Sequence, residues 1–215
     1  MISGYPNDRQ NLTAYYIASS WLYNRDMLYS QKIQKAIRFS VKTHEVYQKQ
    51  KRKGKDIPYI THPLIVGLIL ARAGANEDVV IAGIIHDTIE DSVPEKKVTK
   101  AMITERFGDT VAGIVDDVTE QNKDLPWEER KKKALEHVET LGNESLLVKS
   151  ADLISNISEI IADHQTEGDE IFQRFNAPKE KIVRHYQNMI NAVTSRWPGN
   201  PLIEDLKNLD LRPLV

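Results

Sequence analysis

The chain has 215 residues, a net charge of −2 and 28% charged residues. This length suffices for one sizeable domain with a hydrophobic core, and the balanced charge creates no strong field that would favour nucleic acid or a membrane surface. The absence of cysteine excludes disulfides and thiolate ligands, so any metal ion must be held by histidine and carboxylate side chains.

Residues 1–30 are rich in aromatic side chains, and Asn11 can cap a short helix over 12–22. We expect this extension to pack on the domain or on a second subunit. Its apolar stretch is too short to span a bilayer and lacks the basic flank and cleavage site of a signal peptide. Since the lack of cysteine also suits a reducing compartment, we expect a cytoplasmic protein.

Apolar residues recur at spacings of three and four over 31–50, which predicts a helix. His44 falls on its apolar face, where a lone histidine is more often a packed core group than a ligand. The basic loop 49–56 follows. Such a run of charge is usually a solvated surface, but this one leads directly into His62 at a helix start, where basic side chains can hold phosphate.

Further helices are predicted from apolar periodicity, caps and breakers over 64–73, 77–90, 99–108, 109–119, 127–141, 144–162, 178–195 and 202–208. No stretch favours a strand over a helix. The prediction is therefore an all-α protein with an N-terminal helical extension (1–30), one helical-bundle domain (31–197) and a C-terminal tail with a short helix (198–215).

The apolar run 79–85 ends in His86, Asp87, Glu90 and Asp91. On a continuous helix these side chains share a face, and like charges at such spacing destabilise a helix by roughly 0.2–0.5 kcal/mol per pair. A divalent cation would relieve this repulsion, with nitrogen and oxygen ligands offered by His86 and Asp87. The alternative is a helix end that emerges into solvent, and these residues alone leave both interpretations open.

A narrow polar stripe crosses the otherwise apolar helix 144–162 at Lys149, Asp152, Asn156, Glu159 and Asp163. Periodicity alone favours a solvated helix face. Two features argue against it, the small width of the stripe and the short Asp152 in mid-helix, where aspartate is unfavourable and needs a partner if it is buried.

Along the chain His62, the pair His86-Asp87 and Asp152 follow the order H…HD…D, which resembles the HD-domain superfamily of metal-dependent phosphohydrolases. Four short strings narrow the resemblance: Pro58-Tyr59-Ile60-Thr61-His62-Pro63, His86-Asp87-Thr88-Ile89-Glu90-Asp91, Arg106-Phe107-Gly108 and Leu147-Val148-Lys149-Ser150-Ala151-Asp152. Together they resemble the (p)ppGpp hydrolase domain of the RelA/SpoT proteins and the single-domain small alarmone hydrolases, over residues 33–190.

The resemblance implies an all-α HD domain that binds one divalent ion, typically Mn2+, through His62, His86, Asp87 and Asp152. It also implies that Glu90 and Asp91 activate and position the attacking water. The implied substrate contacts are Arg52 and Lys53 for phosphate, Asn156 for the nucleoside, and Lys149 near the substrate.

Two positions depart from the family pattern. Leu153 stands where the family has a basic residue, and Ser158 where it has arginine, so the nucleotide pocket is expected to differ. The leading expectation is a Mn2+-dependent (p)ppGpp 3′-pyrophosphohydrolase. The alternatives are an HD phosphohydrolase that acts on another nucleotide or phosphoester, and a nucleotide-sensing module without turnover. The expected partner is a small nucleotide, with no nucleic acid or membrane; a homo-oligomer is left open.

Overall fold

The computed structural model describes residues 30–120 and 123–214, so most of the predicted 1–30 extension lies outside it. Within these ranges the protein is all-α, as predicted, and its only sheet-type pairing is an isolated bridge between Lys51 and Pro58. The α-helices are α2 (Gln31–Val41), α3 (Thr61–Arg72), α4 (Glu77–Ile85), α5 (Thr88–Asp91), α6 (Lys100–Phe107), α7 (Asp109–Val118), α8 (Trp127–Val138), α9 (Asn143–Glu167), α10 (Lys179–Arg196) and α11 (Ile203–Lys207). A π-helical segment (Lys42–Tyr47) and the 3-10 turns Pro94–Lys96, Gly168–Arg174 and Arg212–Leu214 complete the elements. None of the helices in the described part is long and apolar enough to cross a membrane.

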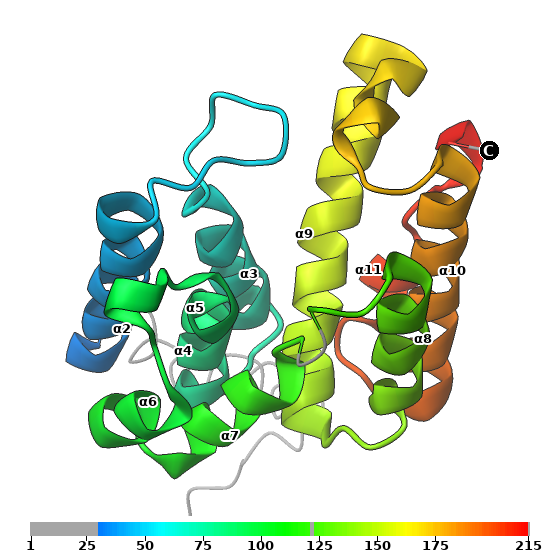
Figure 1. The fold of residues 1–215 in the computed structure, drawn as a ribbon. Helices are drawn as coiled ribbons and strands as arrows, with labels where there is room; N and C mark the ends of the chain where they lie inside the picture. The colour runs from blue at the N-terminus through cyan, green and yellow to red at the C-terminus, as the bar shows by residue number, and fades with distance from the viewer. Residues whose placement is uncertain (1–29, 121–122, 215) are drawn as a thin grey trace, which may run out of the picture.

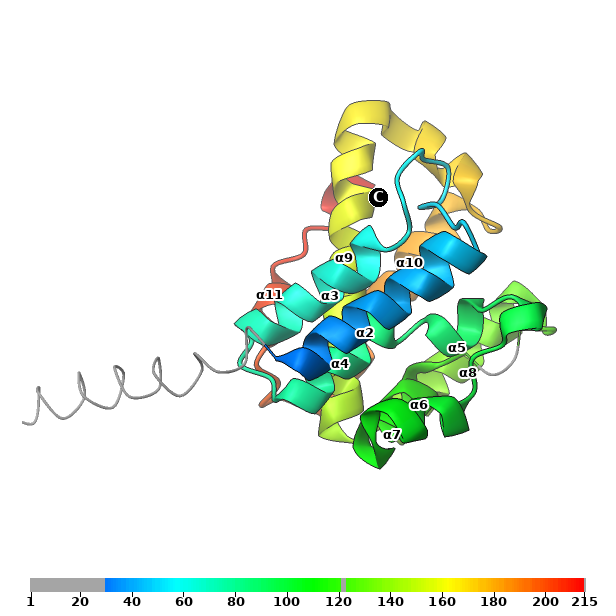
Figure 2. The same cartoon turned by 90° about the vertical axis from the view of Figure 1, so that its left-hand side faces the viewer.

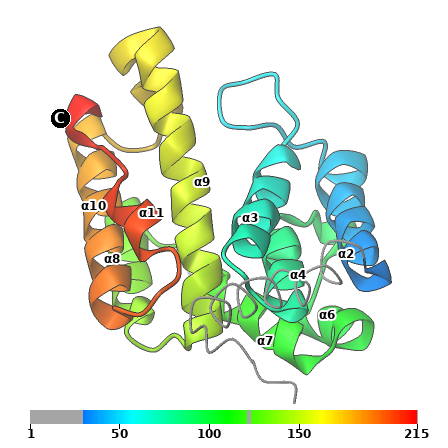
Figure 3. The same ribbon diagram turned by 180° about the vertical axis from the view of Figure 1, so that it is seen from behind.

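Helix α9 runs between two groups of helices (Figures 1 and 3). On one side, α2, α3, α4, α6 and α7 bury the first hydrophobic cluster, to which α9 contributes Val148 and Ala151. On the other side, α8, α10 and α11 bury the second cluster with Leu153 and Ile157 of α9. Because both faces of α9 are packed, its polar stripe is confined to the narrow strip between the two clusters.

Helices α3 and α4 pack closely because each has a glycine at the contact. A Cβ atom added at Gly67 would lie 2.6 Å from the Ile84 side chain, and one added at Gly83 would lie 2.2 Å from that of Leu70. Helix α4 begins at the cap Asn76, whose side chain accepts a hydrogen bond from the Val79 N–H, and residues 79–85 are all buried. This packing fixes His62, near the start of α3, relative to the end of α4.

The predicted helix over 77–90 is wrong as a single element. Helix α4 ends at Ile85, and α5 begins at Thr88. The buried Thr88 hydroxyl donates to the Ile85 carbonyl over 2.7 Å, a local side-chain bond of the kind that competes with helix continuation. The pair His86-Asp87 therefore lies at a break between two helices and not on a regular helix face.

The predicted helix over 31–50 also ends early, because α2 passes at Val41 into the π-helical segment 42–47. After it, the basic loop leaves the bundle and leans toward the C-terminal part of α9 (Figure 2). Ion pairs from Arg52 to Glu159, and from Lys55 to both Glu159 and Asp163, hold it there. The loop and α9 thus form one wall beside the histidine cluster.

Candidate active site

The four side chains expected to bind a metal converge from three elements. His62 lies in the first turn of α3, His86 and Asp87 at the α4–α5 break, and Asp152 in mid-α9. The ligand atoms of His62, His86 and Asp87 lie within 4.8 Å of one another. Asp152 Oδ1 lies 3.3 Å from His62 Nε2 and 4.0 Å from His86 Nε2, so it faces both rings. Residues separated by as many as 90 positions are thereby brought to one point.

Both imidazoles turn their Nε2 atoms toward the carboxylates. His86 Nδ1 lies 2.8 Å from the Gly83 carbonyl oxygen, and His62 Nδ1 lies 2.9 Å from Ser155 Oγ. His86 Nε2 is buried 3.0 Å from Asp87 Oδ2 and has no hydrogen-bond partner in the described part of the chain. An orphaned ring nitrogen between two carboxylates fits a divalent ion, for which imidazole nitrogen and carboxylate oxygen are common ligands.

The electrostatics keep the carboxylates ionised. Burial favours the neutral acid, but the neighbouring His86 and His62 hold the pKa of Asp87 below its ordinary value. Likewise burial opposes the charge of Asp152, yet Lys149 and the imidazoles hold the pKa of Asp152 well below its usual range. Burial lowers the pKa of His86, but Asp87 and Asp152 outweigh it and raise the pKa of that ring to about 9. A bound cation would therefore replace a proton at this position.

Glu90 and Asp91 lie on the short α5 but face different surroundings. Glu90 lines a cleft beside the histidines, and its carboxylate accepts a hydrogen bond from the Glu120 N–H over 3.2 Å. Burial and then the charge of Asp87 raise the pKa of Glu90. Asp91 is not among the cleft-lining residues in the described ranges; its Oδ2 accepts a bond from the Gln50 amide at 2.9 Å. Glu90 is thus the better placed of the two to meet a bound water.

Sequence reasoning missed the side chains that support this site. The Tyr59 hydroxyl donates to Asp87 Oδ2. Gln50 links Asp91 to His44, whose Nδ1 lies 2.9 Å from the Gln50 side-chain oxygen. His44 is fully buried, as its interpretation as a core group requires, but it also belongs to this polar chain. No periodicity identifies such residues, because their partners are distant in sequence.

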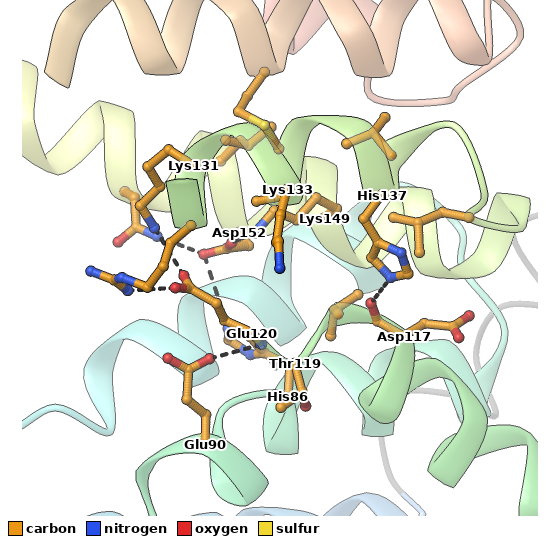
Figure 4. A pocket seen from close by; sticks show the side chains of 18 of the residues that line it. His86, Glu90, Asp117, Thr119, Glu120, Lys131, Lys133, His137, Lys149 and Asp152 are labelled. Atoms are coloured by element: carbon orange, nitrogen blue, oxygen red, sulfur yellow. Dashed lines mark hydrogen bonds and ion pairs between the residues drawn. The ribbon is translucent and has the colours of Figure 1, made fainter. Parts of the chain in front are cut away.

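A cleft of about 680 Å³ opens beside the histidines (Figure 4). Its walls come from α7, α8, α9 and α10, and its cationic side chains include Arg130, Lys131 and Lys149. Glu120 accepts bonds from Arg130 and Lys131 within it. Burial and then the positive charges of Lys131 and Arg130 lower the pKa of Lys53, so these basic side chains lie near one another. The lining also includes the carboxylates of Asp87, Glu90, Asp117, Glu120, Glu136 and Asp152, so a bound metal ion would be needed to balance the charge of an anionic ligand.

The four residues expected to contact substrate fall into two pairs. Lys149 and Asn156 line the cleft, and both donate to Asp152, over 2.9 Å and 2.6 Å. Arg52 and Lys53 do not line it within the described residues. The Arg52 guanidinium is bound by Glu159 and Asn156 and lies over the Tyr59 ring, and Lys53 Nζ lies over that of Phe175.

These contacts also show whether the polar stripe of α9 is a solvated helix face. Its members are joined by hydrogen bonds and ion pairs to one another and to the basic loop: Lys149–Asp152–Asn156–Arg52–Glu159–Lys55–Asp163. The interpretation of the stripe as a plain solvated face is therefore wrong.

Comparison with known proteins agrees with this geometry. A family model described as HD domain matches residues 36–183. The guanosine-3′,5′-bis(diphosphate) 3′-pyrophosphohydrolase MESH1 of Xenopus tropicalis is 35% identical over 130 residues, which are 60% of this chain and 69% of that protein. The MESH1 protein of Danio rerio is 36% identical over 54% of this chain and 63% of its own length. A guanosine-3′,5′-bis(diphosphate) 3′-pyrophosphohydrolase of Aquifex aeolicus is 41% identical over 44% of this chain, which spans only 12% of that protein.

Two solved structures share the fold. A metazoan orthologue of SpoT, described as hydrolysing ppGpp, superposes with a TM-score of 0.66 at 21% identity and covers 84% of this chain and 94% of its own. A protein of Listeria monocytogenes EGD-e superposes with a TM-score of 0.60 at 35% identity, over 69% and 95% of the two chains. The family model and these relatives confirm the resemblance drawn from the sequence: the chain belongs to the HD-domain family.

Proposed function

We propose that this protein is a divalent-metal-dependent phosphohydrolase, most specifically one that converts ppGpp or pppGpp to GDP or GTP and pyrophosphate. One observation carries the proposal: His62, His86, Asp87 and Asp152 face one another and line a cleft that also carries Arg130, Lys131 and Lys149. Relatives named for ppGpp 3′-pyrophosphohydrolysis support the substrate, and the donor set of two nitrogens and two carboxylates suits Mn2+.

The ion, when bound by these four residues, would lower the pKa of a water and polarise a phosphate oxygen. Glu90 is the proposed general base. Its pKa is raised by burial and by Asp87, which moves a carboxylate toward the neutral pH at which a base is most effective. The Gln50–Asp91 bond holds Asp91, which we propose to position the same water.

We propose that the bound ion and the basic side chains of the cleft together balance the charge of the substrate. Lys149 stays protonated, because Asp152 outweighs the effect of burial and raises the pKa of that amine. Lys149 and Asn156 lie nearest the metal ligands, and we propose that they contact the reacting phosphate and the nucleoside. Arg52 and Lys53, on the adjoining loop, are proposed to add phosphate contacts after Arg52 exchanges part of its bonding to Glu159.

The test is to incubate pure protein with ppGpp and Mn2+ and to follow GDP and pyrophosphate, with Mg2+, Zn2+ and chelated samples in parallel. We expect equal amounts of both products with Mn2+ and none after chelation. Binding of Mn2+ without ppGpp turnover would remove the substrate assignment, while turnover with Mg2+ alone would remove the preference for Mn2+.

A second candidate keeps the metal centre but changes the substrate. Leu153, where the family pattern carries a basic residue, lines the cleft as a buried apolar side chain. The cleft therefore has one cation fewer at this position than that pattern provides. A panel of nucleoside polyphosphates and phosphomonoesters, compared by kcat/KM, separates the two, since the leading proposal requires ppGpp to be preferred.

A further inference from the structure

Both ring nitrogens of His62 have partners, and the partners on the two sides differ in kind. On one side Ser155 Oγ lies 2.9 Å from Nδ1. On the other side Nε2 faces Asp152 Oδ1 at 3.3 Å and Asp87 Oδ2 at 3.7 Å. The exposed fraction is 2% for His62 and 7% for Ser155, so water does not readily replace the hydroxyl.

The second imidazole of the site is held differently. The only partner of His86 Nδ1 among the described residues is the Gly83 carbonyl oxygen, which accepts hydrogen bonds and cannot donate one. The proton of a neutral His86 is therefore fixed on Nδ1. A serine hydroxyl, in contrast, both donates and accepts, so it can satisfy Nδ1 of His62 with or without a proton there.

We propose that Ser155 is the positioning residue of His62 and that its hydroxyl serves both tautomers of the ring. Without a metal ion, His62 carries its proton on Nε2 and donates it to Asp152, while Ser155 donates to Nδ1. When His62 acts as a ligand, the proton is on Nδ1, Ser155 accepts it, and the Nε2 lone pair is free. The two states differ in which ring nitrogen carries this proton.

This inference rests on the metal centre of the proposed function but not on its substrate. Partners that orient a ligating histidine through its other ring nitrogen typically change metal affinity by about 10–100-fold when removed. Ser155→Ala leaves Nδ1 without an acceptor in the ligating tautomer. We expect it to raise the Kd for Mn2+, measured by calorimetry, by at least about tenfold.

Three variants on the same helix serve as controls. Ser155→Thr keeps a hydroxyl and should restore affinity to within a few-fold of the parent protein. Ser158→Ala removes an exposed hydroxyl and should leave the Kd for Mn2+ unchanged. Ser150→Ala removes a buried hydroxyl that accepts a bond from Asn200 over 2.7 Å, so it should reduce thermal stability but not Mn2+ affinity. An unchanged Mn2+ Kd in Ser155→Ala would overturn the positioning role.

The tautomer is read directly from long-range proton–nitrogen correlation spectra of protein with labelled histidine, recorded without metal and with diamagnetic Zn2+. We expect the His62 proton on Nε2 in the first state and on Nδ1 in the second. A proton on Nδ1 in both states would overturn the exchange. Parent protein that binds Mn2+ but leaves ppGpp intact would refute the proposed substrate alone, whereas parent protein that binds neither ion would overturn this inference as well.

Discussion

Glu90 combines three properties that suit a proton acceptor: it lines the cleft, it is held by the Glu120 N–H, and its pKa is raised. The next residue is Asp91, whose Oδ2 accepts a hydrogen bond from the Gln50 amide. The two carboxylates therefore differ in what their removal should do. Loss of Glu90 removes the proposed base, and loss of Asp91 removes the carboxylate that the Gln50 amide binds.

We expect Glu90→Gln to lower kcat for ppGpp about 10²–10⁴-fold, the usual contribution of a general base, with little change in Mn2+ affinity. Steady-state kinetics at saturating Mn2+ and a calorimetric Kd give both quantities. Glu95→Gln, on the exposed turn 94–96, is the matched control. A Glu90→Gln protein that still turns over at the parent rate would assign the base to another residue.

His185 lies in the cleft lining, and its titration should affect the stability of the fold. Burial, and then the charges of Lys131 and Lys149, lower the pKa of His185 to about 4. In the unfolded chain its pKa is about 6.5, so the unfolded state binds more protons between these two values. Stability should be unaffected by this group above about pH 6.5 and should decrease as the pH falls toward 4.

We expect this group to remove on the order of 1–2 kcal/mol from the free energy of unfolding between pH 7.5 and 4.5, after allowance for partial exposure. Urea unfolding at both pH values, for the parent protein and His185→Gln, measures it. The loss should be smaller in the variant. Parallel losses in the two proteins would show that His185 does not titrate as described.

Among the elements, the basic loop is held against the C-terminal part of α9 by ion pairs and by a close contact at Gly54. Gly54 has a φ of +70° and lies against the Arg174 side chain, where an added Cβ atom would approach Cδ to 2.4 Å. Arg174 in turn pairs with Asp163 and Glu167. A side chain at Gly54 would therefore strain the backbone and also displace this arginine.

Gly54→Ala should destabilise the protein by more than Gly74→Ala, which has a similar φ of +74° but no atom within 4 Å of an added Cβ. The left-handed conformation alone costs about 1–2 kcal/mol for alanine, and both variants bear it. The difference between their free energies of unfolding thus reports the Arg174 contact. In Gly54→Ala we also expect faster amide exchange in the loop and a higher KM for ppGpp. Equal free energies of unfolding, exchange rates and KM values in the two variants would contradict a stabilising role of the Gly54–Arg174 contact.

Most of the helices could be predicted from the sequence, because apolar residues recur every three to four positions in a helix with one buried face. The break at His86-Asp87 could not be predicted. Residues 79–85 are apolar on every side, and the hydrogen bond from Thr88 to Ile85 at the end of α4 cannot be seen in a hydropathy pattern. The local charge pattern offered His86 and Asp87 as candidate ligands, whereas His62 and Asp152 followed from a resemblance. Ser155 could not be found this way, because it meets His62 across 93 positions.

At the scale of the molecule, the site joins the two packing groups. His62, His86 and Asp87 belong to the helices of the first hydrophobic cluster, whereas Asp152 lies on α9, which both clusters share. Without a cation, Asp87 and Asp152 repel each other: the negative charge of Asp152 acts to raise the pKa of Asp87. A bound divalent ion would convert this repulsion into a bridge between α9 and the α4–α5 break.

Divalent metal should therefore stabilise the whole fold. At a Mn2+ concentration of 100 times Kd, the expected gain is about 2.7 kcal/mol, if the unfolded chain binds no metal. For a chain of this size that corresponds to a rise in Tm of roughly 5–10 °C, measurable by calorimetry. Asp152→Asn should abolish the rise, because it removes a ligand charge. Asp163→Asn, on the same helix but paired with Lys55 and Arg174, should retain it despite a lower starting Tm. The same increment in both variants would mean that Asp152 is not part of the metal centre and that the ion acts elsewhere on the protein.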